Sequence, residues 1–373
     1  MTTEKISFTV PQQGLRYLLD RARGAVGRMH PYFKIDIYLT GRITCCATDL
    51  RVGVLTELDN RNNDTAVECG GTFCVAADKF FNLVSALPAI DVQLQGLDNY
   101  KIRISCGTYT GVVACVDPEQ HFPDMILPGG DPDIVCAGGF LNDIYAAIGH
   151  AVGNQEDTAT AGINIQALNG RLVGAATNGH RLSVAGIATP YDGECEPFDT
   201  GITLAPKSIA EIKKLNCGAC DVRIRENRMS IEQTNITIVS RLYEAIYPNY
   251  RRIIPEHPNC AVVLVSKLIE AVQRVGILND TREIGLSIGS NSITVSAQST
   301  AGELIDIVPC ETESEPVLIL LSPAYLLESL KSLVKDGDDV IIKWLDDKSP
   351  IMILPADFSN WDERLELIVP RSN

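Results

Sequence analysis

Three stretches of the chain share one pattern of apolar and polar positions. Each begins with an apolar, strand-like segment, passes through Ala and a small polar cluster, and ends in a second strand-like segment. The three stretches are ITCCATDLRVGVLTEL (43–58), LVGAATNGHRLSVAGI (172–187) and ITVSAQSTAGELIDIV (293–308). On alignment, Ala47, Ala176 and Ala297 superpose. The pattern predicts three copies of one strand–turn–strand unit.

Two sets of helical segments repeat in the same order. One amphipathic helix is predicted in each of VAADKFFNLVSAL (75–87), LAPKSIAEIKKL (204–215) and LSPAYLLESLKSL (321–333). Pro206 and Pro323 suit the first turn of a helix, where a missing N–H costs little. Apolar residues at i, i+3, i+4 and i+7 mark the buried face of the first of these helices, at Phe80, Leu83, Val84 and Leu87. A short strand and a helix open each unit, at 8–27, 134–153 and 262–280.

These marks recur in the same order at intervals of about one domain length, which predicts three homologous domains. The interval is too long for a solenoid repeat. Loops rich in Pro, Gly and charge, at 127–133 and 255–260, are the expected boundaries. The predicted domains are 1–130, 131–257 and 258–373. The predicted fold class is α+β, with two helices in each domain packed on antiparallel sheets.

The composition is that of an ordinary globular protein. Of the 373 residues, 45% are hydrophobic and 21% are charged. No apolar run approaches the roughly 20 residues of a membrane-spanning helix. The first ten residues, MTTEKISFTV, lack the basic and apolar regions of a signal peptide. We therefore expect a cytoplasmic protein that does not contact membranes.

The twelve cysteines are scattered along a long chain, which favours reduced thiols. Cys217 and Cys220 form a CxxC pair. A zinc site would need further Cys or His ligands at matching spacing, and a redox CxxC would open a helix after a strand. Neither context is present, so the sequence predicts no metal and no cofactor.

The segment ATNGHRL (176–182) places Gly179, His180 and Arg181 next to one another, as catalytic loops often do. The chain nevertheless has no nucleophile elbow, P-loop, HExxH motif or Gly-rich dinucleotide fingerprint. The equivalent turns of the other two units, ATDLRVG and AQSTAGE, contain no His. The fold therefore does not require His180, and a site specific to the second domain is predicted. A hydrolase that uses His180 is the alternative of a different class.

Five motifs in order resemble the bacterial β sliding clamp family over nearly the whole chain. They are KFFNLVSALP (79–88), HFPDMILP (121–128), ATNGHRL, YPNYRRIIP (247–255) and LELIVPRSN (365–373). The resemblance implies a DNA clamp fold without catalytic activity, in which a head-to-tail homodimer forms a ring of six domains around duplex DNA. It also implies, as partners, the replicative polymerase catalytic subunit, the clamp loader and other proteins with a clamp-binding motif.

The same resemblance implies a pocket between the second and third domains. A partner inserts a short peptide there, typically Gln followed by hydrophobic residues. The residues that match this pocket are Gly162, Thr177, Gly179, His180, Arg181, Leu182, Pro248, Arg252, Ile253, Tyr325, Leu367, Ile368, Val369 and Pro370. We expect an apolar floor from Leu182, Ile253 and 367–369, with donors from His180 and Arg181. The terminus Arg371-Ser372-Asn373 replaces a Met-Arg-Leu-like tail, which predicts a somewhat different peptide preference.

A net charge of −15 argues against nucleic acid as a partner, yet the predicted helices lean basic. The candidate DNA-binding residues are Arg23, Arg28, Lys79, Gln155, Lys207, Lys214, Lys267 and Arg274. Arg28, Gln155 and Lys207 among them rest on the resemblance, and the segment after Gln155 departs from the family pattern. Two alternatives stay open: solvated helix faces without function, and a clamp-like scaffold that does not encircle DNA.

A head-to-tail ring needs exposed strand edges that pair across the interface between subunits. The resemblance places the segment TGVVAC (110–115) on one side, with Val112 and Ala114 in contact and Phe80 and Leu83 behind them. Ile277 and Leu278 match the facing apolar patch. The alternative is that all of these residues belong to the core of the monomer.

Overall fold

The computed structural model describes residues 6–59, 65–137, 139–153, 159–168, 171–188, 198, 201–215, 218–278, 282–289, 291–358 and 360–371. The chain divides into two compact units. Unit 1 is Met1–Gly139 with Lys207–Leu242, and unit 2 is Phe140–Pro206 with Tyr243–Asn373. The predicted second domain is thus shared between the two units. The division into three domains and its boundaries stay a prediction.

Unit 1 is built on one antiparallel sheet, whose strand order is β10-β15-β16-β17-β4-β3-β2-β6-β9-β8-β7-β1-β5. Buried and exposed residues alternate along strands such as β7, as expected when one face of a sheet covers a core. Its strands are β1 (Ser7–Pro11), β2 (Tyr32–Ile37), β3 (Ile43–Thr48), β4 (Val52–Leu58), β5 (Ala66–Cys69), β6 (Gly71–Ala76), β7 (Asp91–Leu97), β8 (Lys101–Cys106), β9 (Tyr109–Val116), β10 (Ile134–Ala137), β15 (Ala219–Arg225), β16 (Arg228–Gln233) and β17 (Ile236–Arg241).

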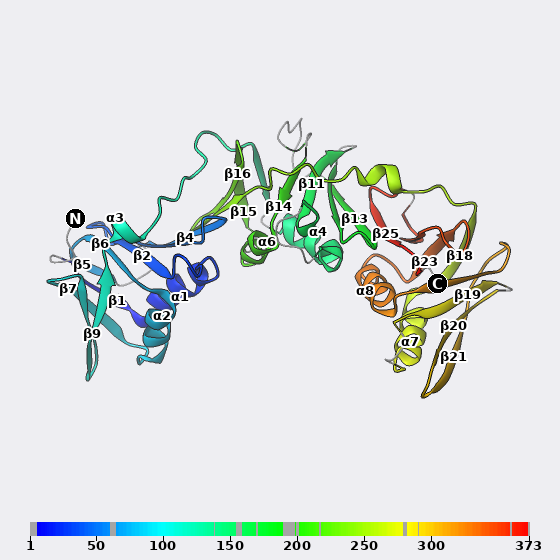
Figure 1. Ribbon diagram of the computed structural model, residues 1–373. Helices are drawn as coiled ribbons and strands as arrows, with labels where there is room; N and C mark the ends of the chain where they lie inside the picture. The colour runs from blue at the N-terminus through cyan, green and yellow to red at the C-terminus, as the bar shows by residue number, and fades with distance from the viewer. Residues whose placement is uncertain are drawn as a thin grey trace. The chain divides into compact units, whose positions relative to one another are not determined.

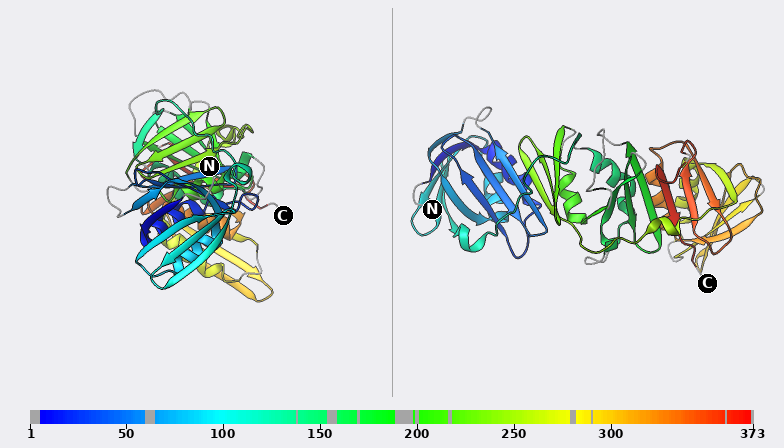
Figure 2. Two further views of the ribbon diagram at one scale, coloured as in Figure 1. Left: turned by 90° about the vertical axis from the view of Figure 1, so that its left-hand side faces the viewer. Right: turned by 90° about the horizontal axis from the view of Figure 1, so that it is seen from above.

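Helices α1 (Gln12–Arg23) and α2 (Ala77–Ala86) pack side by side on this sheet (Figures 1 and 2). The side-chain amide of Gln12 donates to the carbonyl of Val84 at 2.7 Å, which ties the start of α1 to α2. Thr56 on β4 donates to the carbonyl of Leu18 at 2.9 Å, which ties α1 to the sheet. The unit also contains α3 (Pro118–His121) and, from Lys207 onward, α6 (Pro206–Ile212).

Unit 2 contains two antiparallel sheets, with strand orders β14-β11-β12-β13-β25-β24-β23-β18 and β21-β20-β19-β22. The strands are β11 (Ile163–Leu168), β12 (Arg171–Thr177), β13 (Arg181–Ala188), β14 (Ile202–Leu204), β18 (Asn259–Leu264), β19 (Ile284–Gly289), β20 (Ser292–Ser299), β21 (Gly302–Pro309), β22 (Val317–Leu321), β23 (Asp339–Trp344), β24 (Ile351–Pro355) and β25 (Arg364–Ile368). The helices are α4 (Phe140–Ile148), α7 (Val265–Val275) and α8 (Pro323–Leu333), with short helices η3 (Gly149–Ala151), η4 (Ala159–Ala161) and η5 (Tyr250–Ile253).

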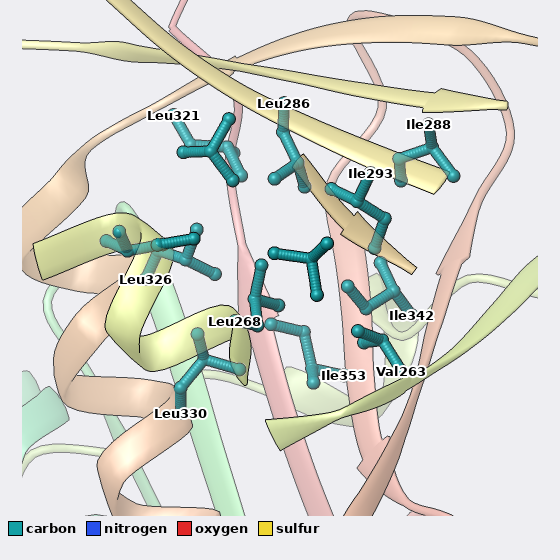
Figure 3. Close-up of a cluster of buried hydrophobic side chains, with 14 of the residues drawn as sticks. Val263, Leu268, Leu286, Ile288, Ile293, Leu321, Leu326, Leu330, Ile342 and Ile353 are labelled. Carbon is teal, nitrogen blue, oxygen red and sulfur yellow. The ribbon is translucent and has the colours of Figure 1, made fainter. Parts of the chain in front are cut away.

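The core of unit 2 lies between helices α7 and α8 and the two sheets. Leu268 of α7 and Leu326 and Leu330 of α8 point toward Leu286 of β19 and Ile353 of β24 (Figure 3). All five side chains are fully buried, and burial of one such Leu or Ile stabilises a fold by about 1.5–3 kcal/mol. The apolar faces that the sequence predicts for these helices therefore pack against the apolar faces of the two sheets.

The predicted α+β class and the repeated elements are confirmed. The three strand–turn–strand stretches form the hairpins β3–β4, β12–β13 and β20–β21, and the two helix sets form α1, α4 and α7, and α2, α6 and α8. The turns also share a hydrogen-bond pattern. Asp49 Oδ1 accepts from the N–H groups of Arg51 and Val52, and Asn178 Oδ1 accepts from those of His180 and Arg181. In the third turn, Ser299 Oγ accepts from the N–H of Ala301.

A buried cluster of charges joins the helices of unit 2 to its larger sheet. Glu366 on β25 is fully buried and accepts from Ser183 at 2.5 Å, Ser329 at 2.9 Å and Arg364 at 2.8 Å. The imidazole of His150 lies 3.0 Å from the same carboxylate. Arg364, also buried, donates to the carbonyl of Ala147 at 3.1 Å. Glu366 and Arg364 thereby connect β25 with β13, α4 and α8.

Burial alone would raise the pKa of Glu366. The charge of Arg364 and the hydrogen bonds from His150 and Ser183 outweigh burial, and the pKa is lowered. A carboxyl group whose pKa is lowered by folding stabilises the fold above its unfolded pKa of about 4.3. This contribution is lost as the pH falls through the lowered folded pKa, so the cluster weakens in acid.

We expect Glu366→Gln to destabilise unit 2 by about 3–5 kcal/mol, because the substitution leaves the charge of Arg364 buried without its partner. Urea denaturation followed by Trp fluorescence measures this, since both Trp residues of the chain, Trp344 and Trp361, belong to unit 2. The matched control is Glu313→Gln, at an exposed carboxylate of the same unit. Equal midpoints for the two variants would contradict the role assigned to the cluster.

Candidate functional site

The turn between β12 and β13 is held by its own side chains. Thr177 Oγ1 donates to the carbonyl of Arg181 at 2.6 Å and accepts from the N–H of Gly179 at 3.2 Å. Gly179 has a φ of 86°, in the left-handed region that favours glycine. A Cβ at Gly179 would meet no atom of the described residues within 4 Å. Glycine is therefore required by the backbone conformation and not by lack of space.

The predicted pocket residues on β13, which follows the turn, and on its neighbour β25 lie on two different faces of the sheet. In the antiparallel pairing of β13 and β25, Arg181 lies opposite Ile368 and Leu182 lies opposite Leu367. Successive side chains of a strand point to opposite faces. Ile368 accordingly belongs to the core beneath α7 and α8, whereas Leu182 and Leu367 pack with Tyr250 on the other face.

Arg181 is an internal residue, with 7% of its surface exposed. Its guanidinium donates to Glu328 at 2.5 Å and to the carbonyl of His150, and it lies 4.5 Å from the centre of the Tyr325 ring. Nε is buried with no hydrogen-bond partner in the described part of the chain. Arg181 therefore binds chiefly to its own chain, and its expected donation to a bound peptide stays a prediction.

Several other predicted pocket residues are also buried. Thr177, Leu182, Leu367 and Ile368 each have less than a tenth of their surface exposed. A Cβ at Gly162 would lie 2.5 Å from the carbonyl oxygen of Leu204, so no side chain fits there. The predicted apolar floor is thus wrong for Leu182, Leu367 and Ile368. Its accessible members are Ile253, 56% exposed, and Val369, 37% exposed.

Three exposed or half-buried members, His180, Tyr325 and Val369, lie together where β13 begins and β25 ends. His180 stacks on Tyr325 with ring centres 6.4 Å apart, and its carbonyl accepts from the N–H of Val369 at 2.9 Å. Tyr250 anchors η5, which carries Ile253, over the sheet beside these strand ends. We call the accessible set the rim, which consists of Gly179, His180, Pro248, Arg252, Ile253, Tyr325, Val369 and Pro370.

A cavity of about 370 Å³ lies beside the segment that leads to η5. It is lined by polar groups of Gln166 and Arg251, by the rings of Tyr243 and Tyr247, and by Pro248 of the rim. No local pattern in the sequence indicates this cavity, because its walls come from β11, β14 and a segment that lies about 80 residues after β11. Gln166 Oε1 accepts from Arg251 at 2.6 Å, which holds this segment against β11.

Most of the candidate DNA-binding side chains pair with carboxylates. The pairs are Arg23–Asp78 at 3.0 Å, Lys207–Asp49 at 2.5 Å, Lys214–Glu211 at 2.7 Å, Lys267–Glu270 at 3.3 Å and Arg274–Asp306 at 2.5 Å. Arg28 and Lys79 are exposed and bind no carboxylate among the described residues. Gln155 lies outside those residues. Pairing with these carboxylates reduces the positive charge that the five side chains present to an outside anion.

One predicted edge for subunit pairing is open. β9 pairs with β8 along most of its length and with β6 only at Cys115 and Val116. Val112 and Ala114 on this strand are exposed, and Ile277, beyond α7, is 71% exposed. Leu83 and Leu278 are half-buried.

Phe80 is only 1% exposed and packs edge-to-face on Phe73 at 6.2 Å. It belongs to the core of unit 1, which agrees with the alternative that the sequence left open for this residue, and the subunit interface itself stays a prediction. A further apolar edge, at β21, was not among the edges expected from the sequence. β21 lies at the edge of the four-stranded sheet with Ile305 and Ile307 exposed, which the alternation in GELIDIVP would have revealed.

The thiols and His180 offer no catalytic arrangement in the part of the chain that the structure describes. Burial raises the pKa values of Cys46 and Cys74 to about 12, so both are protonated thiols at neutral pH. The imidazole of His180 makes no hydrogen bond with a described residue. Cys220 is buried on β15, while Cys217 lies outside the described residues.

The described residues contain no group of three or more His, Cys, Asp or Glu side chains arranged to hold a metal ion. They also contain no helix that is long and apolar enough to cross a membrane.

Comparison with known proteins identifies related chains. The family model for the central domain of the DNA polymerase III beta subunit matches residues 140–249, and that for its C-terminal domain matches residues 251–364. Together they cover more than half of the chain. A β sliding clamp of Streptococcus pneumoniae is 22% identical over 350 residues, which is 90% of each chain. One of Staphylococcus aureus is 24% identical over 303 residues, covering 78% of this chain and 77% of that one.

Solved structures share the fold. The DNA polymerase III β chain from Streptococcus pneumoniae matches with a TM-score of 0.90 at 20% identity, over 99% of this chain and all of the other. The DNA polymerase sliding clamp from Bacillus subtilis matches with a TM-score of 0.91 at 21% identity, over the same shares.

We expect Arg181 and His180 to differ sharply in their effect on stability. Arg181→Ala removes a buried side chain with its contacts to Glu328, His150 and Tyr325, and should destabilise unit 2 by about 2–3 kcal/mol. His180→Ala removes an exposed ring and should change stability by less than about 0.5 kcal/mol. Urea denaturation followed by Trp fluorescence measures both. A similar loss in the two variants would contradict this division of roles.

Proposed function

The chain belongs to the family of the bacterial DNA polymerase III beta subunit, the non-catalytic β sliding clamps, and we propose that it forms a homodimeric ring closed around duplex DNA. As a β sliding clamp it serves DNA replication, with DNA and a DNA polymerase as partners. The proposal extends to the clamp loader and to other proteins that carry a clamp-binding motif. It places the protein in the cytoplasm, where the bacterial chromosome is replicated.

The open edge of β9 is the observation that carries the proposed ring. An exposed strand with apolar residues is a hazard unless it pairs with another chain. β9 belongs to unit 1, whereas Ile277 and the edge strand β21 belong to unit 2. A contact between the two surfaces across subunits is heterologous, and two such contacts close a head-to-tail dimer. Closure retains DNA without sequence-specific contacts.

The rim is the proposed docking site for partner peptides. Ile253 and Val369 supply accessible apolar surface, and the stacked rings of His180 and Tyr325 supply a flat wall beside it. Apolar anchors carry most of the affinity in such sites, while polar groups fix orientation. Because Leu182, Leu367 and Ile368 are buried, the rim of the unliganded chain is shallower than the pocket expected from the sequence. Arg371 at its end adds a charge, which favours peptides with an acidic residue there.

We expect Ile253→Asp to weaken binding of a peptide with Gln followed by hydrophobic residues by at least about tenfold, because it places a charge on an apolar anchor. Fluorescence anisotropy with a labelled peptide measures the affinity. Ile126→Asp introduces the same change at an exposed Ile of unit 1 and serves as the control. Equal affinity in both variants would remove the rim as the docking site.

We expect the wild-type protein to remain on nicked circular DNA during gel filtration and to leave once the DNA is cut to a linear form. The ring is opened by dilution and closed by reconcentration with the DNA. Ile277→Asp puts a charge in the proposed interface and should yield a monomer that is not retained, with light scattering as the check on oligomeric state. Retention on linear DNA equal to that on circles would contradict encirclement. A stable dimer that is never retained would favour the scaffold alternative.

A further inference from the structure

Asp49 binds one candidate DNA-binding residue, Lys207, and packs against Gly27, which precedes a second, Arg28. Asp49 Oδ2 accepts from Lys207 Nζ at 2.5 Å, and the same ammonium group donates to the carbonyl of Val26 at 3.3 Å. The backbone of Gly27 packs directly on Asp49, since a Cβ there would lie 2.5 Å from Asp49 Cβ. Arg28, exposed and without a carboxylate partner in the described residues, follows in the chain. Lys207 therefore binds this carboxylate directly, and Arg28 follows the glycine that packs on it.

The turn that contains Asp49 does not need its negative charge. Asp49 Oδ1 accepts from two backbone N–H groups, at 2.9 Å and 2.8 Å. In the equivalent turn of the second hairpin, the amide oxygen of Asn178 accepts the same two hydrogen bonds, at 3.0 Å and 3.1 Å. A neutral side chain thus satisfies the turn. The negative charge of Asp49 is therefore needed only for its ion pair with Lys207.

Asp49 is ionised at neutral pH. Burial alone would raise its pKa, but the hydrogen bond from Lys207 and those from the N–H groups of Val52 and Arg51 lower it. Lys207 keeps 38% of its side chain exposed, so its ammonium group remains within reach of an outside anion. A DNA phosphate that approaches Lys207 therefore competes with a carboxylate that is already bound.

We propose that Asp49 sets the affinity of this clamp for DNA by holding Lys207 in an internal ion pair. Contact with a phosphate is then an exchange of one anion for another, and its net gain is small. The inference rests on the proposed function, since it specifies how the encircled duplex is contacted. A small gain per contact suits a ring that slides, because strong phosphate contacts would slow its movement along DNA.

The test is the affinity for a short linear duplex, measured by fluorescence anisotropy at several salt concentrations. Asp49→Asn preserves the turn and frees Lys207, so we expect about two- to fivefold tighter binding at low salt, the equivalent of an exposed ion pair. The slope of log K against log salt should steepen by about 0.9, as expected for one added phosphate contact. Asp98→Asn, at an exposed carboxylate in the β7–β8 turn, changes net charge equally and should leave both values unchanged.

Lys207→Gln separates the proposed exchange from a general effect of charge. In the wild type it should reduce affinity by less than about twofold, and in the Asp49→Asn background it should abolish the gain. A gain that persists without Lys207, or one equalled by Asp98→Asn, overturns the proposal. Wild-type retention on circular DNA with no effect of Asp49→Asn overturns this inference and leaves the ring intact. Loss of that retention, with no duplex binding by any variant, overturns both.

Discussion

The backbone pairing of β13 with β25, and of β4 with β17, is the constraint on which the surfaces of this protein depend. In each case the second strand of a hairpin pairs with a strand that lies far along the chain, and this pairing continues the sheet. The register of this pairing fixes which side chains of the hairpin face the helices and which face the other side. A slip of one residue would exchange them, because side chains alternate along a strand.

The same pairing places each hairpin turn against a helix of the following repeat. The turn after β3 meets α6 through Asp49 and Lys207, and the turn after β12 meets α8 through Arg181 and Glu328. The two turns have the same internal hydrogen bonds, yet they present different chemistry. The first holds a cation that is proposed to contact DNA, and the second supports the stacked wall of the rim. The same hairpin turn thus occurs twice with different side-chain contacts, and a different role is proposed for each copy.

The sequence predicted the repeated elements well because their signals are local. Hydrophobic periodicity marked the helices, and alternation around a polar turn marked the hairpins. Local patterns could not show which face of a sheet a side chain occupies or which distant residue it contacts. The burial of Ile368 depends on its register opposite Arg181, and the ion pair of Asp49 joins residues 158 positions apart. The helical periodicity of the sequence is the same whether Phe80 lies behind a subunit interface or in the core of the monomer. Its edge-to-face packing on Phe73 places it in the core.

The charge arrangement bears on how a protein of net charge −15 holds an anionic polymer. If affinity retained the DNA, unpaired cations would be expected along the helices, because each neutralised phosphate adds to binding. The pairs formed by Arg23, Lys207 and Arg274 instead satisfy these cations within the chain. Among the candidate residues, only Arg28 and Lys79 bind no carboxylate within the described part of the chain. The proposed closed ring would retain DNA without such contacts, so the proposal makes retention depend on the open strand edges.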